Sequence, residues 1–425
     1  MEANTSIPGL PLRLALGTVI IVMFAWMFDS MDLMLLIITI RSMAHISQLN
    51  FDLYTVGALI ISVALLTSGL GGILFGFIAD RYGRKKTLIV SILMYSIPTF
   101  LIGFVRNWIE LLILRLFSGF GVGGAWASGM TLVAETVDSR DRGKAVSIVQ
   151  CGFPVGFLLA IFLAFLVAYR PSNGAIFSNW RMAFIVGAVP AILLSVLVSI
   201  FVPESKIWKF RLMRERIKVR DVFVDRELRK RFFIGLTMDF LGMFSYWVFW
   251  SWLPSYLESA YRVGELSMLN NMFWLIATQV GALMGYLMYG FAQDHIGRRT
   301  SWSIFTAGEG ALILLSIFMI DMLIRGEALP ISLFFVIGFG LGYFTGFWSA
   351  FGAILSELFP TEVRGTVSGL IFNIGRSINF VSPIFVGYLA KIYGFGLALS
   401  TASIVCFMMS AIVWLLPETK GKELL

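Results

Sequence analysis

The sequence contains few charged residues. Of its 425 residues, 14% are charged and 58% are hydrophobic, whereas about 25% of the residues of a typical soluble domain are charged. A soluble chain could not cover so much apolar surface with so few charges, which excludes an ordinary globular protein. The same composition excludes a disordered chain, a collagen and a disulfide scaffold.

Cysteine and histidine are also scarce, with two of each. Cys151 and Cys406 both lie within apolar runs, which argues against a disulfide framework and against a thiolate metal site. His45 and His295 are far apart in the sequence, so we expect neither catalytic zinc nor a histidine-based triad. We find no nucleotide-binding or phosphorylation motif, which disfavours ATP coupling. We therefore expect no enzyme activity, no metal and no cofactor.

Long apolar runs are abundant instead. A bilayer core about 30 Å thick requires roughly 20 apolar residues per helix. Runs of about this length occur at 14–40, 55–79, 87–105, 108–133, 145–168, 182–202, 232–256, 269–292, 300–320, 329–355, 366–389 and 395–416. The first run is too long for the core of a signal peptide and is expected to be retained. These runs predict an all-α membrane protein with twelve transmembrane helices, whose surroundings are the lipid bilayer.

The lysine and arginine residues orient these spans. The side that holds both termini and the central segment 203–231 carries 24 of them, the opposite loops carry seven, and two lie within spans. Because cytoplasmic loops are enriched in lysine and arginine, both termini are expected in the cytoplasm, in a plasma or inner cell membrane. This placement accounts for the net charge of +8 without a nucleic-acid partner. The basic central segment is either a solvated topology signal or a contact for anionic lipid.

Four short segments of the first half of the chain recur in the second half in the same order. Gly76–Lys85 recurs at 290–299 and Pro203–Glu204 at 417–418, both at an offset of 214 residues. Gly119–Gly123 recurs at 338–342, at an offset of 219. Glu135, Arg142 and Gly143 recur as Glu357, Arg364 and Gly365, at an offset of 222. The chain is therefore expected to comprise an N-terminal six-helix half (1–202), a cytoplasmic linker (203–231) and a C-terminal six-helix half (232–425). Parallel halves of this kind place substrate at their interface near the bilayer midplane.

The repeated loop motif has a direct physical interpretation. Gly76 permits close helix approach, and Gly83 permits a tight turn. Asp80 can accept hydrogen bonds from backbone N–H groups at a neighbouring helix N-terminus. The basic residues of the loop can bridge to carboxylates such as Glu135. Contacts made in one state and broken in the other would form a cytoplasmic latch, although the charges could instead only mark a cytoplasmic loop.

The residues assigned to this latch are Gly76, Asp80, Arg81, Gly83, Arg84, Glu135, Arg142, Asp294, Arg298, Glu357 and Arg364. The doubled G-x-x-x-D-x-x-G-R-[RK] loops resemble the signature of the major facilitator superfamily. The segments 203–206 and 417–421 resemble its sugar-porter-like branches. The resemblance covers essentially the whole chain and implies two pseudo-symmetric six-helix bundles that carry solute by alternating access. It says little about the substrate.

Two acidic residues of the first span and an arginine of the fourth form a candidate proton-coupling site. Asp29 and Asp32 are three residues apart and share a helix face. At 1.5 Å per residue, they lie about 16 and 12 Å below the outer surface, and Arg115 lies about 10 Å below it. An ion pair between the two spans is therefore feasible. Two carboxylates so close together would not both ionise easily, so one is expected to carry a transported proton. The alternative is an Asp–Arg pair that only fixes helix packing.

Arg376 is the candidate anion-binding residue. It lies about 15 Å into the eleventh span, near the midplane, and Asn373 and Asn379 are nearby polar residues. A guanidinium suits bidentate recognition of a carboxylate, so a substrate carboxylate is the expected partner. The alternative partners are Asp239 and Glu309.

Asp239 and Glu309 are counted at about 10 and 13 Å from the cytoplasmic side, and neither is assigned to substrate binding. Glu309 could only buttress the loop arginines 298 and 299. Aromatic residues at span ends usually form an interfacial belt. Trp247 and Trp348 lie deeper in their spans and could line an aromatic-walled cavity.

Local stretches favour one branch of the superfamily. Trp26–Asp32 resembles the D-x-x-D element of aromatic-acid and nicotinate proton symporters. Gln150–Ala160 resembles the fifth span of sialate and lactate proton symporters, which makes Gln150 a candidate substrate-binding residue. These resemblances imply a proton-coupled carrier of a small organic carboxylate, and we expect it to be a monomer.

Two other functions stay open. A sugar or polyol proton symporter of the same fold is the first, although the Q-Q-x-x-G element of sugar porters is absent from Met238–Gly242. A membrane sensor that binds solute without transporting it is the second. A sensor is expected to carry an added cytoplasmic domain, for which residues 417–425 leave no room.

Overall fold

The computed structural model describes residues 12–45, 49–137, 142–170, 176–205, 208, 220–263, 267–327, 330–350, 354–355, 358–359 and 361–418. Within them the chain is helical apart from turns, extended connections and an isolated β-bridge between Arg170 and Phe177. Twelve helical segments are long and apolar enough to cross a membrane. The predicted all-α architecture with twelve spans is therefore confirmed.

The first six spans contain nine helical elements. These are α1 (Leu12–Ala44), η1 (Leu53–Gly57), α2 (Ala58–Tyr82), α3 (Arg84–Ile102), α4 (Trp108–Thr136), α5 (Arg142–Gln150), α6 (Gly152–Leu163), η2 (Ala164–Ala168) and α7 (Trp180–Phe201). Elements η1 and η2 are short π-helical turns that continue α2 and α6.

The last six spans follow the short helix α9 (Arg220–Val224). They comprise α10 (Arg226–Trp250), α11 (Leu253–Val263), α12 (Met268–Ile296), α13 (Arg298–Ile324), α14 (Ile331–Phe344), η3 (Thr345–Ser349), α16 (Thr361–Ile378), α17 (Val381–Tyr393), α18 (Phe395–Ile412) and η4 (Val413–Leu415).

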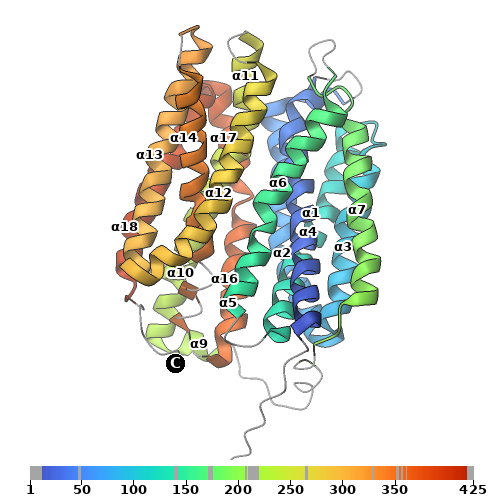
Figure 1. The fold of residues 1–425 in the computed structure, drawn as a ribbon, viewed down its shortest axis with the longest axis vertical. Helices are drawn as coiled ribbons and strands as arrows, with labels where there is room; N and C mark the ends of the chain where they lie inside the picture. Colours follow the sequence, from blue (N-terminus) through green and yellow to red (C-terminus); the bar gives the residue numbers. More distant parts are fainter. Residues whose placement is uncertain are drawn as a thin grey trace, which may run out of the picture.

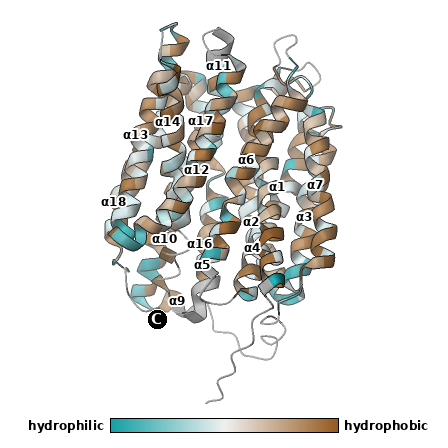
Figure 2. Ribbon diagram, viewed as in Figure 1, coloured by the Kyte–Doolittle hydropathy of each residue, from teal (hydrophilic) through white to brown (hydrophobic). Residues whose placement is uncertain are grey.

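The spans form two bundles that stand side by side, with α1–α7 in one and α10–α18 in the other (Figure 1). We call the end of the molecule that holds α9 and the C-terminus the terminus side, and the opposite end the far side. Hydrophobic residues dominate the middle of the helices, whereas hydrophilic residues gather toward their ends (Figure 2). This distribution is the one that a bilayer requires.

Two helices begin earlier than their apolar runs predict. Helix α10 begins at Arg226 rather than near 232, because Asp225 accepts a hydrogen bond from the backbone N–H of Leu228 (2.8 Å) and caps the helix. Helix α16 begins at Thr361 rather than near 366. At 1.5 Å per residue, Asp239 and Arg376 therefore both lie about 20 Å from the starts of their helices.

The fifth and eleventh spans are each interrupted within their length. The fifth is divided at Cys151, between α5 and α6, and the eleventh at Asn379 and Phe380, between α16 and α17. The Asn379 amide donates to the carbonyl oxygens of Phe240 (3.1 Å) and Gly375 (2.8 Å). A side chain thus satisfies backbone groups at the break, as a broken helix within a membrane requires.

The two bundles touch closely where α2 meets α16. A Cβ atom on Gly72 would lie 1.8 Å from Asn373 Oδ1, and one on Gly69 would lie 2.1 Å from Ser377 Oγ. Only glycine at these two positions lets the helices approach so far. Trp126 of α4 also stacks on Phe372 of α16, with ring centroids 4.2 Å apart and an interplanar angle of 12°.

Candidate substrate and proton sites

A cavity lies between the two bundles. The space in it that is not filled by atoms, open solvent included, is about 460 Å³. Its lining residues come from both halves of the chain: Trp26, Gln150, Phe153, Met243, Tyr246, Trp247, Tyr286, Trp348, Phe372 and Arg376. Of the candidate substrate-binding residues, Gln150, Trp247, Trp348 and Arg376 line this cavity.

Arg376 is the charged residue of this lining. Its side chain is buried, with 2% of the residue exposed. Nε and Nη1 have no hydrogen-bond partner among the described residues, and the guanidinium lies over the ring of Trp26 at 5.8 Å from the centroid. A buried cation without a hydrogen-bonded anion is costly. The arrangement therefore leaves a guanidinium able to pair with an anion in the cavity.

Aromatic rings form most of the cavity wall. Tyr246 makes edge contacts with Phe153, Trp247 and Trp348, with ring centroids 6.1, 5.4 and 5.7 Å apart. Trp26 lies 5.6 Å from Phe153. Such rings present flat apolar surfaces, with few polar groups to satisfy hydroxyl groups of a ligand.

Sequence reasoning did not assign five of the aromatic lining residues: Trp26, Phe153, Tyr246, Tyr286 and Phe372. Trp26 and Phe153 lie within stretches singled out by their resemblance to acid symporters, which was the available signal. Tyr286 carries no local signal, because its role depends on packing between helices far apart in the sequence.

Asn373, also expected to contact substrate, is not part of the cavity lining. Its amide donates to the carbonyl oxygen of Gly369 (2.8 Å), and its Oδ1 packs against Gly72 of α2. In this conformation Asn373 lies at the contact between the bundles, one helical turn before Arg376.

The carboxylates of α1 differ sharply in their surroundings. Asp32 accepts from Arg115 Nη1 (2.8 Å) and from the hydroxyl of Thr99 (2.7 Å). Asp29 is fully buried, and both its oxygens lack a hydrogen-bond partner among the described residues. An ionised carboxylate in such a position is costly, so Asp29 is the better placed to hold a proton.

Asp239 and Glu309 are also buried, at 0% and 1% exposure. Asp239 packs against α16, because a Cβ on Gly375 would lie 2.0 Å from Asp239 Oδ2. Glu309 does not buttress the loop arginines as expected. It lies 3.5 Å from the thiol of Cys406, which in turn lies 3.0 Å from Ser245 Oγ.

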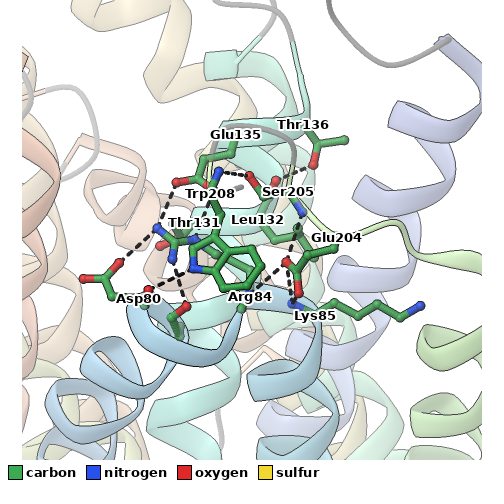
Figure 3. A network of polar contacts seen from close by, with 12 residues as sticks. Asp80, Arg84, Lys85, Thr131, Leu132, Glu135, Thr136, Glu204, Ser205 and Trp208 are labelled. Atoms are coloured by element: carbon green, nitrogen blue, oxygen red, sulfur yellow. Dashed lines mark hydrogen bonds and ion pairs between the residues drawn. The ribbon is translucent and has the colours of Figure 1, made fainter. Parts of the chain in front are cut away.

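The predicted loop network of the N-terminal half is built around Arg84 (Figure 3). Its guanidinium contacts both oxygens of Glu135 (3.0 and 3.1 Å) and pairs with Asp80 (3.0 Å). Glu204 Oε1 accepts from the backbone N–H groups of Arg84 and Lys85 (2.9 and 3.2 Å), at the N-terminus of α3. Glu204, rather than Asp80, therefore caps a helix here.

The C-terminal half repeats this arrangement. Glu418 accepts from the backbone N–H groups of Arg298 (3.0 Å) and Arg299 (3.2 Å), at the N-terminus of α13. Asp294 pairs with Arg298 (2.6 Å). The turns that precede these helices have φ of +107° at Gly83 and +96° at Gly297, a region that favours glycine. The recurring Pro-Glu pairs thus supply the two helix caps.

Of the other latch residues that the structure describes, Gly76 and Arg81 do not make the contacts expected of them. A Cβ on Gly76 would have no described atom within 4 Å, although close helix approach was expected there. Arg81 lies over the ring of Tyr82 (5.5 Å) rather than on a carboxylate. Arg142 lies in α5 and Arg364 in α16, but the structure does not describe their side chains. Glu357 lies outside the described residues.

Polar and aromatic contacts join the halves on the far side. Arg41 of α1 donates to Ser255 O and to Ser259 Oγ (2.6 Å) of α11. Lys391 of α17 lies 3.5 Å from Asp52. A hydrogen bond from the side chain of Thr55 is the main reason why the pKa of Asp52 is below its ordinary value. In this structure polar contacts therefore hold the two halves together on the far side.

Comparison with known proteins agrees with this architecture. The family model described as Major Facilitator Superfamily matches residues 14–378. A probable 4-methylmuconolactone transporter of Cupriavidus pinatubonensis is 34% identical over 85% of this chain and 81% of its own length. The cis,cis-muconate transport protein of Acinetobacter baylyi is 30% identical over 91% of each chain.

Among solved structures, the partially occluded inward-open form of the Escherichia coli xylose transporter XylE superposes with a TM-score of 0.75 at 19% identity. The match covers 97% of this chain and 100% of that one. At this identity the likeness shows the fold. Taken together with the family match over most of the chain, it shows that the protein is a membrane transporter of the major facilitator superfamily and not an enzyme.

Proposed function

We propose that this protein transports a small, planar organic carboxylate together with protons by alternating access. The observation that carries the proposal is the buried guanidinium of Arg376 in a cavity walled by aromatic rings. Its Nε and Nη1 have no hydrogen-bond partner in the part of the chain that the structure describes. A substrate carboxylate would neutralise the guanidinium, and a flat unsaturated body would pack between the rings. The similarity of the chain to carriers of muconate and of methylmuconolactone supports this substrate class.

In the proposed cycle Asp29 carries a proton while Asp32 stays paired with Arg115. The loop networks around Arg84 and Arg298 hold the helix ends on the terminus side, which we place in the cytoplasm. Opening on the far side would break the contacts of Arg41 and Lys391, and closure on the terminus side would bring the latch residues together. Proton and substrate binding would bias these two states through their different affinities for each.

Binding assays with the purified full-length chain test the anion site. Nicotinate and cis,cis-muconate serve as anionic probes, nicotinamide as the neutral ring of matched shape, and D-xylose as the sugar probe. We expect the anions to bind, with nicotinate at least tenfold tighter than nicotinamide. Arg376→Ala should weaken anion binding by about 3 kcal/mol, over a hundredfold in Kd. Arg376→Lys should restore little, because an ammonium lacks the bidentate fork.

The matched control is Arg325→Ala, which removes an exposed arginine at the end of α13 on the far side and should leave binding unchanged. Unchanged anion affinity in Arg376→Ala would overturn the carboxylate site. Tight binding of xylose with no anion binding would favour the sugar or polyol carrier.

A further inference from the structure

Two buried carboxyl groups that belong to different halves of the chain lie near enough to Arg376 to act on its charge. Asp29 of α1 and Asp239 of α10 both interact electrostatically with its guanidinium. Neither is within ion-pair distance of it among the described contacts, and all four of their oxygens lack a hydrogen-bond partner there. Both residues are fully buried.

Asp239 is held in this position by the packing of α10 on α16. Its Oδ2 fills the space that a side chain at Gly375 would need, directly beside Arg376. Gly375 therefore makes room for the carboxyl group. The cavity is lined by Arg376 but by neither aspartate, so a substrate in it would contact the arginine and not the two carboxyl groups.

The charge of this group of three residues decides whether an anion can bind. With both aspartates ionised, the group carries a net charge of −1 and repels an anion. One arginine can neutralise one carboxylate. When a substrate carboxylate pairs with Arg376, the positive charge of the arginine no longer compensates the aspartates. Two buried carboxylates without hydrogen bonds or counter-charge are costly and would take up protons instead.

We propose that Asp239 is a second proton site, in the C-terminal half, so that anion binding at Arg376 loads one proton on Asp29 and one on Asp239. The inference rests on the proposed function and extends it to two protons per anion. Each half of the transporter then contributes one proton-carrying residue to a single anion site.

The neighbouring titratable groups are compatible with this assignment. Asp29 is near Asp32, Tyr95 of α3 and Arg376. Asp239 has Arg376 of α16 as its charged neighbour. Cys406 of α18 contacts Glu309 and Ser245. Ser245 lies more than one helical turn after Asp239 in α10, and no hydrogen bond joins this group to Asp239 among the described residues. From α17, Lys391 lies at the far-side end, beside Asp52.

Proteoliposomes that contain the full-length chain can count the protons. A tenfold inwardly directed proton gradient is imposed with the membrane potential clamped at zero, and accumulation of radiolabelled cis,cis-muconate is measured at equilibrium against protein-free vesicles. Two protons per anion allow about 100-fold accumulation, and one proton allows about tenfold. We expect about 100-fold for the wild type and about tenfold for both Asp239→Asn and Asp29→Asn.

Accumulation of only tenfold by the wild type, or of 100-fold by Asp239→Asn, would overturn the second proton site and leave the proposed function standing. The wild-type value decides the question even where Asp239→Asn does not fold. Failure of the wild type to accumulate muconate would overturn the proposed function itself. A role of Asp239 in packing alone predicts lower yield of Asp239→Asn with unchanged accumulation per folded molecule.

Discussion

The two halves of the transporter share their loops and differ in their membrane-embedded charges. Gly83, Arg84 and Glu204 in the first half match Gly297, Arg298 and Glu418 in the second, with the same cap on the following helix. Inside the bilayer the first half pairs its arginine with an acid, whereas the second half leaves its arginine facing the cavity. Duplicated residues thus build the scaffold, and residues that are not duplicated build the site.

The largest expected effect comes from breaking the ion pair of the first half. Arg115→Met leaves Asp32 with a single hydrogen bond from Thr99. An uncompensated buried carboxylate costs about 3–5 kcal/mol. We expect a marked drop in the melting temperature of the purified chain, measured by tryptophan fluorescence.

The double replacement Arg115→Met with Asp32→Leu should recover most of this stability, because no charge is left unpaired. A single replacement that melts at the wild-type temperature would contradict a structural role for the pair. The stability of the first half would then not depend on its buried arginine–acid pair.

A large effect on coupling, with little effect on stability, is expected from Asp29→Asn. The amide mimics the protonated acid, so accumulation driven by a tenfold proton gradient should fall about tenfold. Exchange of internal for external substrate should continue, since it does not require proton release. Loss of exchange together with accumulation would show that Asp29 is needed for substrate binding or for the conformational change.

Intermediate and equal effects are expected from the two helix caps. Glu204→Gln and Glu418→Gln each remove a charge from two backbone N–H groups at a helix N-terminus, worth about 0.5–2 kcal/mol. Thermal unfolding of both variants should show shifts of similar size. A large shift in one variant alone would mean that the loops, although alike in sequence, do not support their halves equally.

A smaller effect is expected from Asp80→Asn. It removes the pair with Arg84, while Glu135 keeps its two contacts with the same guanidinium. Asp80 is about half exposed, so the stability change should stay below about 1 kcal/mol. The transport rate should fall more than substrate affinity, measured as kcat against KM. Cysteine labelling that shows an unaltered balance of states would remove Asp80 from the latch.

The smallest effect is expected from Lys391→Gln on the far side. The contact with Asp52 is exposed and worth a few tenths of a kcal/mol at most. The folded-state pKa of Asp52 is lowered below its ordinary value of 3.8. The ionised Asp52 therefore contributes to the stability of the folded state at neutral pH, and this contribution is lost as the pH falls below 3.8. The melting temperature of the variant should lie slightly below that of the wild type at pH 7 and equal it in strong acid.

The fold could be predicted from the sequence because long apolar runs, basic loops and a duplicated motif all indicate the same architecture. The start of α10 could not be predicted, because the helix includes six mostly charged residues before its apolar run. Helix α16 likewise begins five residues before its predicted start near 366. Counts of apolar residues measure the hydrocarbon layer, whereas a capped helix extends past it.

The cavity could be predicted only in part. Trp247, Trp348 and Arg376 were found because large aromatics and charges are conspicuous within apolar spans. Tyr286 and Phe372 were not found, because a residue enters the cavity wall through its rotation about its helix axis and the crossing of the helices. Neither quantity is encoded locally in the sequence.

The stack of Trp126 on Phe372 offers an optical signal of the transport cycle. One ring belongs to each bundle, and the ring centroids lie 4.2 Å apart. When the bundles move relative to each other, the indole exchanges an aromatic neighbour for lipid, water or substrate, and its emission wavelength and yield change. Subtracting the spectrum of Trp126→Phe from that of the wild type isolates this one fluorophore among twelve tryptophans. Turnover can then be followed in real time without an attached dye.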